Sequence, residues 1–181
     1  MTVASDAPFD DLADVARRGA REWEREMAVG EADAEQLRMR GRSLTDVLWE
    51  AMQRGDIVTL ILGERELTGR LLGARNDLAV VALSDGVAAV NLSSVDAARL
   101  GRGGEGTSGD RTYGSFRAYL GMLEVEGRPV VVLGRGVEVR GTVVAVAPDH
   151  LLVRATSDVN WALPLRAVAA VLDAASRPEP I

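Results

Sequence analysis

The sequence predicts an α+β fold that is mainly β, with N-terminal helices followed by two tandem repeats, each a helix and a small β-barrel. Three observations predict it. Residues 43–98 recur as residues 115–171 after a Gly-rich linker. Within each copy, apolar spacing changes from helical to alternating, and a glycine lies inside the second alternating segment. The predicted parts are an N-terminal helical segment 1–42, a first barrel 43–100, a Gly-rich linker 101–114, a second barrel 115–173 and a tail 174–181.

The duplication is visible because one constant offset aligns the two copies. Laying Gly69 on Gly141 superposes the other key positions without a gap. These are Ser43 on Ser115, Gly55 on Gly127, Glu66 on Glu138 and Asp77 on Asp149; after a slip of one residue, Leu92 falls on Leu165 and Val95 on Val168. We call residues 43–100 repeat one and residues 115–173 repeat two.

Composition excludes several classes of function. The chain has no cysteine, which excludes disulfides, thiolate metal sites and thiol nucleophiles. All 21 basic residues are Arg, a choice that suits phosphate recognition but also follows from a GC-rich genome. The net charge is -6, whereas strong nucleic-acid binders carry a basic excess. No leader or membrane-length apolar run is present, so we expect a cytoplasmic protein without membrane contact.

Apolar residues near the N-terminus recur at spacings of three and four and predict a helix of about five turns. Pro8 lies in its first turn, behind the capping residue Asp6. The apolar stripe is narrow and nearly heptad-like, so the helix either packs on its own barrels or pairs with a second chain. The candidate oligomerisation residues on this stripe are Phe9, Leu12, Ala16, Trp23 and Met27.

Repeat one is predicted to begin with a helix and to continue as short strands. Ser43 and Asp46 resemble a capping box at the start of that helix. At Gly55 the period changes, and Gly69 marks a bend that lets a short sheet curl. The expected strands are 57–62, 66–73, 78–83 and 87–92, with 93–98 as a helical turn or fifth strand.

Repeat two follows the same order. Pro164 indicates that its fourth strand runs at a sheet edge or ends there. The closing segment 167–172 is unusually apolar, and small barrels hide their edge strands by pairing, so we expect the two repeats to pack on each other or on a partner. The expected elements are a helix over 115–124 and strands 129–133, 137–147, 151–156, 161–165 and 167–172.

In this order of elements, both repeats resemble the Sm-like family of small SH3-like barrels. The spacing of its first motif is matched in repeat one by Val58, Leu60, Leu67, Gly69, Leu71 and Leu72 before Asn76-Asp77 and Leu78, and in repeat two by Val130, Val132, Val139, Gly141 and Val143 before Asp149. The second motif, an apolar residue and then Arg-Gly, is matched only by Leu165-Arg166-Ala167, while Ser93-Ser94 stands there in repeat one.

The resemblance covers roughly two thirds of the chain and is shared in part by other SH3-like barrels. It implies RNA binding by loop residues at the pore of a ring. The matching loops are 75–77 and 149–150, with Arg166 and Asn160 from the last loop. Repeat one departs from the family pattern because it lacks the Arg-Gly, and the tandem fusion departs from a simple six- or seven-membered ring.

Two non-enzymatic functions compete: an RNA-associated regulatory protein of Sm-like type, and an assembly scaffold that binds a protein partner or itself. Catalysis, a metal and a cofactor are not expected, because the sole histidine has no nucleophile or ligand cluster beside it in the sequence. A homo-oligomer is expected. Surface arginines paired with Glu138 or Asp158 are the competing explanation for the basic residues. The candidate nucleic-acid-binding residues are Arg75, Asn76, Arg140, His150, Arg154, Asn160, Trp161 and Arg166.

Overall fold

The computed structural model describes residues 23, 27, 40–103 and 114–173. The chain divides into two compact units, residues 1–42 and residues 43–181. In the first unit, Trp23 and Met27 have helical backbone and exposed side chains. Phe9, Leu12 and Ala16 lie outside the described residues, as does most of the N-terminal helical segment.

Each repeat opens with a helix whose ends the sequence specifies. Helix α2 (Leu44–Arg54) begins after Ser43, which forms a capping box with Asp46. The Ser43 Oγ accepts a hydrogen bond from the Asp46 N–H at 3.2 Å, and the Asp46 carboxylate accepts one from the Ser43 N–H at 2.9 Å. It ends at Gly55, which has a φ of 72° that favours glycine. Helix α3 (Phe116–Glu126) has the equivalent caps Ser115 and Gly127. No helix among the described residues is long and apolar enough to cross a membrane.

The strands occupy nearly the positions that the alternating pattern predicts. Two short 3-10 turns, η1 (Leu92–Ser94) and η2 (Leu165–Ala167), precede the last strand of each repeat. The strands of repeat one are β1 (Ile57–Leu62), β2 (Arg65–Arg75), β3 (Leu78–Leu83), β4 (Gly86–Asn91) and β5 (Ala97–Gly101); those of repeat two are β6 (Pro129–Gly134), β7 (Val137–Val146), β8 (His150–Ala155), β9 (Asn160–Pro164) and β10 (Val168–Asp173).

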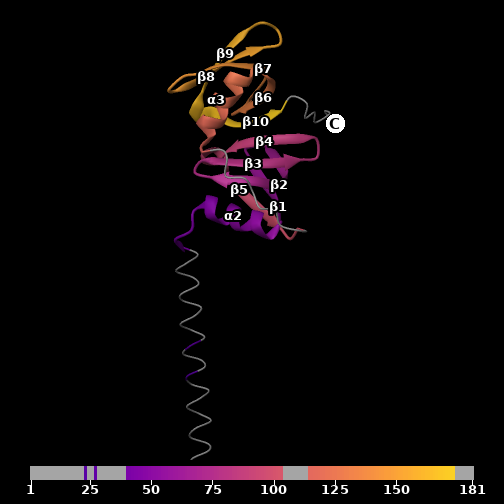
Figure 1. Cartoon of the computed structure of the whole chain (residues 1–181), viewed down its shortest axis with the longest axis vertical. Helices are drawn as coiled ribbons and strands as arrows, with labels where there is room; N and C mark the ends of the chain where they lie inside the picture. Colours follow the sequence, from indigo (N-terminus) through magenta and orange to yellow (C-terminus); the bar gives the residue numbers. More distant parts are fainter. Residues whose placement is uncertain (1–22, 24–26, 28–39, 104–113, 174–181) are drawn as a thin grey trace, which may run out of the picture. The chain divides into compact units, whose positions relative to one another are not determined.

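All ten strands belong to one antiparallel sheet with the order β5-β1-β2-β3-β4-β10-β6-β7-β8-β9. The predicted fold class, N-terminal helices followed by two tandem barrels, was therefore wrong. The fold is mostly β, and the α-helices with described bounds are α2 and α3, which open the two repeats. The physical reason is strand pairing, because β4 and β10 satisfy each other's edge hydrogen bonds, which separate barrels would leave open. Figure 1 shows this junction, where yellow β10 lies beside magenta β4.

The strands around the junction are buried on both faces, which explains their unbroken apolar sequences. On β4, Ala88 and Val90 join one core while Ala89 joins the other. Helix α2 packs over β1 and β2 at the first core, and α3 packs over β7 and β4 at the second. Each core also contains strand residues of the other repeat, such as Leu133 in the first and Val80 in the second. The two repeats therefore share their cores.

The inner glycines have the same surroundings in both repeats. A Cβ atom at Gly69 would lie 2.0 Å from the Ala82 carbonyl oxygen, and one at Gly141 would lie 2.0 Å from the Arg154 carbonyl oxygen. The pairing register shifts shortly after each glycine, between Leu71 and Gly73 in repeat one and between Val143 and Ala145 in repeat two. The bend predicted from the sequence is thus a close strand contact followed by a β-bulge.

We expect Gly141→Ala to lower the free energy of unfolding by about 1–3 kcal/mol or more, because the added methyl group meets backbone that cannot move aside cheaply. Urea denaturation measures the change. Gly121→Ala is the matched control, because a Cβ at this position in α3 meets nothing within 4 Å and alanine favours the helix. Equal stability of the two variants would contradict the assigned strand contact.

Candidate functional site

Within the described residues, the sheet ends at two open edges, β5 and β9. The repeat alignment makes β9 the equivalent of β4, and β5 the equivalent of β10, so the open edges correspond to the two strands that pair at the junction. β5 pairs on one side with β1, and β9 pairs on one side with β8. Each edge therefore presents a row of backbone N–H and C=O groups on its other side.

Exposure differs sharply between the equivalent strands. Ala89 of β4 is fully buried at the junction, whereas its equivalent Ala162 on β9 is exposed. Ala170 of β10 is fully buried, whereas its equivalent Ala97 on β5 is exposed. Trp161 on β9 keeps 42% of its surface exposed. The open edges thus carry small or apolar side chains where the paired edges bury theirs.

Polar contacts fix how the two repeats meet. The Asn91 side-chain amide of β4 donates to the Val168 carbonyl oxygen of β10 at 3.2 Å. Across the junction, the Arg65 guanidinium lies 2.8 Å from the Glu138 carboxylate, which also pairs with Arg140 at 3.1 Å. The hydrogen bond from Arg65, assisted by Arg140, lowers the pKa of Glu138 below its ordinary value. Sequence patterns did not reveal the contact of Arg65 with Glu138, because the two residues are 73 positions apart in the chain.

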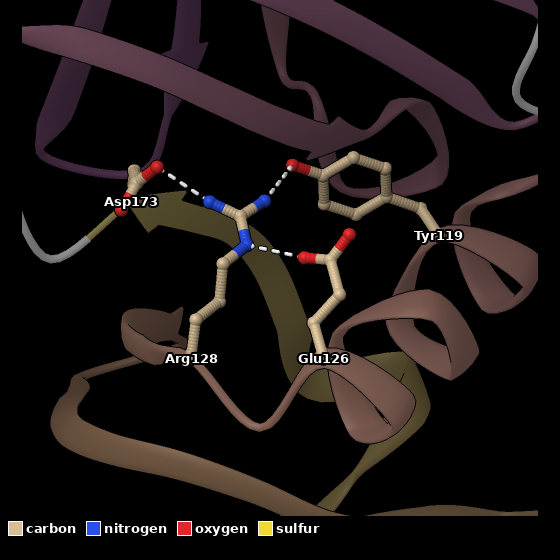
Figure 2. Close-up of polar contacts among 4 residues, drawn as sticks. All are labelled: Tyr119, Glu126, Arg128 and Asp173. Carbon is tan, nitrogen blue, oxygen red and sulfur yellow. Dashed lines mark hydrogen bonds and ion pairs between the residues drawn. The ribbon is translucent and has the colours of Figure 1, made fainter.

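A cluster around Arg128 ties the end of α3 to the end of β10 (Figure 2). The Arg128 guanidinium donates to Glu126 at 2.6 Å, to the Tyr119 hydroxyl at 3.4 Å, and to Asp173. Burial lowers the pKa of Arg128, but Tyr119 and the two carboxylates outweigh that effect and raise it. The cluster borders a cavity of about 280 Å³ whose other wall comes from repeat one at Leu72, Gly73, Val80 and Val87.

Repeat one has the same ion pair with its charges exchanged. Arg54 stands where repeat two has Glu126, and Asp56 stands where it has Arg128. The Arg54 guanidinium lies 2.7 Å from the Asp56 carboxylate. In both repeats the pair thus joins a helix end to the residue just before the next strand, which indicates a structural role.

Two of the candidate nucleic-acid-binding residues share a pocket. His150 and Arg166 line a hollow of about 450 Å³ together with Pro148, Asp149, Pro164 and Leu165. His150 Nδ1 lies 2.7 Å from Asp149 Oδ1, and this hydrogen bond lowers the pKa of Asp149. The turn that contains Asp149 lies beside η2, because the backbone carbonyl oxygen of Asp149 accepts a hydrogen bond from the Leu165 N–H at 2.9 Å. In repeat one, Asp77 accepts from Leu92 in the same way.

The other candidates lie in separate places. Arg140 pairs with Glu138, as the surface-charge interpretation predicted. Arg154 and Asn160 are opposite each other on β8 and β9, next to exposed Trp161. Asn76 is engaged at the junction, where its side chain donates to the Gly114 carbonyl oxygen, and it stands in the turn beside Arg75. The set therefore does not form one continuous surface.

Among residues 40–103 and 114–173, no three histidine or acidic side chains gather into a metal-binding group. No protein-family model and no curated protein matches this chain, so the Sm-like resemblance stays a prediction.

We expect Glu138→Gln to reduce stability at neutral pH and to lose that effect in acid. The pKa of Glu138 is lower in the folded state than in the unfolded state. Glu138 therefore stabilises the fold at pH values above its unfolded-state pKa, and this stabilisation is lost as the pH falls through its folded-state pKa. A double-mutant cycle with Arg65→Met should give a coupling of about 0.2–1 kcal/mol at pH 7, because the pair is partly exposed.

Glu66→Gln is the matched control for this cycle, since Glu66 is the repeat-one equivalent and, within the described residues, forms its ion pair with Arg99 of its own repeat. Urea titrations at pH 7 and below pH 4.5 measure both variants. No coupling between Arg65 and Glu138 at pH 7 would contradict a stabilising bridge between the repeats.

Proposed function

We propose that this chain is a non-enzymatic assembly module that joins further copies of itself head to tail, with β9 of one copy pairing with β5 of the next. The observation that carries the proposal is the junction inside the chain, where the equivalent strands β4 and β10 pair antiparallel. A second copy would repeat this contact with β9 and β5, the strands that end the sheet within the described residues. The cytoplasmic location predicted from the sequence is part of the same proposal.

The junction also supplies the register. Its pairs are Val90 with Ala170, Ala89 with Val171 and Ala88 with Leu172. The equivalent pairs between copies are Leu163 with Ala97, Ala162 with Ala98, and Trp161 with Arg99. None of these pairs brings like charges together, and the last places a guanidinium opposite an exposed indole, where a cation–π contact is worth about 0.5–1 kcal/mol.

The two edges are different surfaces, so the contact is heterologous. Such contacts give a closed ring when the rotation between copies returns to the start, and an open array when it does not. When the sheet of one copy pairs with the sheet of the next, the backbone N–H and C=O groups of the open edge strands form hydrogen bonds. Left unpaired, these groups are a template for unspecific pairing with other chains. The proposal thus gives the open edges a defined partner.

We expect Ala162→Arg and Ala97→Arg each to stop assembly, because each puts a long charged side chain where the internal junction buries an alanine. Each variant retains one intact edge, β5 in the first and β9 in the second. Mixing them should therefore give a heterodimer and nothing larger, whereas the unchanged chain forms larger species. Sedimentation velocity measures all four samples.

Ser157→Arg is the control, since it adds the same charge at an exposed turn away from the strand pairing. Denaturation curves establish that each variant is folded. A monomeric unchanged chain, or two variants that each assemble alone, would refute the head-to-tail arrangement.

The RNA-associated function is the second candidate, favoured by the shared pocket of His150 and Arg166. RNA binding of this kind should weaken as salt rises and fall further when Arg154 and Arg166 are both changed to Ala. Fluorescence anisotropy with a labelled single-stranded RNA at low and moderate salt measures it. Arg70→Ala with Arg135→Ala removes the same charge at exposed positions that do not line this pocket, and serves as the control. An absence of binding at low salt would remove this candidate.

A further inference from the structure

The internal junction includes a contact between a turn of repeat one and the start of the helix of repeat two. The Phe116 N–H donates to the Asp77 carboxylate at 2.9 Å. Phe116 is the first residue of α3, so its N–H has no acceptor within the helix. The adjacent Asn76 side chain donates to the Gly114 carbonyl oxygen just before the helix. The β2–β3 turn therefore receives the incoming helix when β4 pairs with β10.

The equivalent turn of repeat two is open. Asp149 corresponds to Asp77, and its side chain is 86% exposed. Among the described residues, its side chain contacts His150 through Oδ1. The surrounding hollow of about 450 Å³ lies beside β9, the open edge, and Pro164 and Leu165 form part of its wall. A carboxylate thus stands at this edge in the position that holds a helix start at the junction.

The equivalent helix start is that of α2. Leu44 is its first residue and corresponds to Phe116, so its N–H likewise lacks an acceptor within the helix. The capping box engages the N–H groups of Ser43 and Asp46, and it leaves the Leu44 N–H for another acceptor. The positive end of the helix dipole also favours a carboxylate there.

We propose that the pocket around Asp149 holds the start of helix α2 of the next copy, with the Asp149 carboxylate accepting from the Leu44 N–H. The inference rests on the proposed head-to-tail assembly and extends the internal junction to a second copy of this chain. Repeat two has Pro148 where repeat one has Asn76, so it lacks the side-chain donor that contacts Gly114 at the junction. The carboxylate is consequently the main polar contact at this point between copies.

The heterodimer of the two edge variants tests the contact one side at a time. The Ala97→Arg chain presents β9 and Asp149, and the Ala162→Arg chain presents β5 and Leu44. Adding Asp149→Ala to the first chain should weaken the heterodimer about tenfold, the cost of losing one hydrogen bond to a charged acceptor. Adding Leu44→Pro to the second should weaken it by a similar factor, because proline has no N–H.

Proline is suited to this position, since it is favoured as the first helical residue and Ser43 before it already has φ -75° and ψ 161°. Two controls accompany these variants. Leu44→Ala in the second chain keeps the N–H and should leave the dissociation constant within about twofold. Glu64→Ala in the first chain removes an equal charge at an exposed turn and should also leave it within about twofold. A heterodimer that carries both Asp149→Ala and Leu44→Pro should bind no more weakly than one that carries either change alone.

Dissociation constants come from sedimentation equilibrium. An Asp149→Ala heterodimer as tight as the parent would overturn the assigned contact while leaving edge pairing intact. Additive losses from Asp149→Ala and Leu44→Pro would also overturn it, because the two groups would then act separately. A parent pair that stays monomeric would overturn the assembly itself.

Discussion

The pairing of β4 with β10 is the interaction on which the rest of the structure depends. It joins two groups of five strands into one sheet and places α3 over strands from both repeats. Because successive residues on these strands point to opposite faces, one pairing supplies side chains to two cores. The same pairing brings α3 to the turn at Asp77 and Arg65 to Glu138.

Apolar burial, and not charge, is the main source of stability at this junction. Fully burying a valine or leucine side chain contributes about 1.5–3 kcal/mol, whereas a partly exposed ion pair contributes about 0.2–1 kcal/mol. Val90, Val132 and Val171 are all buried there, while Arg65 and Glu138 keep access to solvent. The ion pair and the amide of Asn91 select one register among the sheet alignments that burial alone would allow.

Local features of the fold could be predicted from the sequence, but the partner of each strand could not. Gly69 and Gly141 marked the bends, and the expected strands 57–62 and 78–83 agree with β1 and β3. The apolar segment 167–172 indicated a buried strand, but it did not indicate that the strand pairs with β4 of the other repeat. One shared sheet was therefore predicted as two barrels. The surface-charge interpretation named Glu138 as a partner of a surface arginine, and Arg140 pairs with it. The contact of Asp77 with the start of α3 was not predicted, because the helix lies 39 residues later in the chain.

The exchanged charges at the two helix ends have a consequence for the ancestry of the chain. A gene-conversion event that copied α3 into repeat one without its strand would set Glu126 against Asp56, and the reverse event would set Arg54 against Arg128. Either recombinant would replace an attraction at 2.6–2.7 Å with a repulsion. At this pair the two repeats are therefore not interchangeable, because the charge at each helix end is matched only by the residue that follows it in the same repeat.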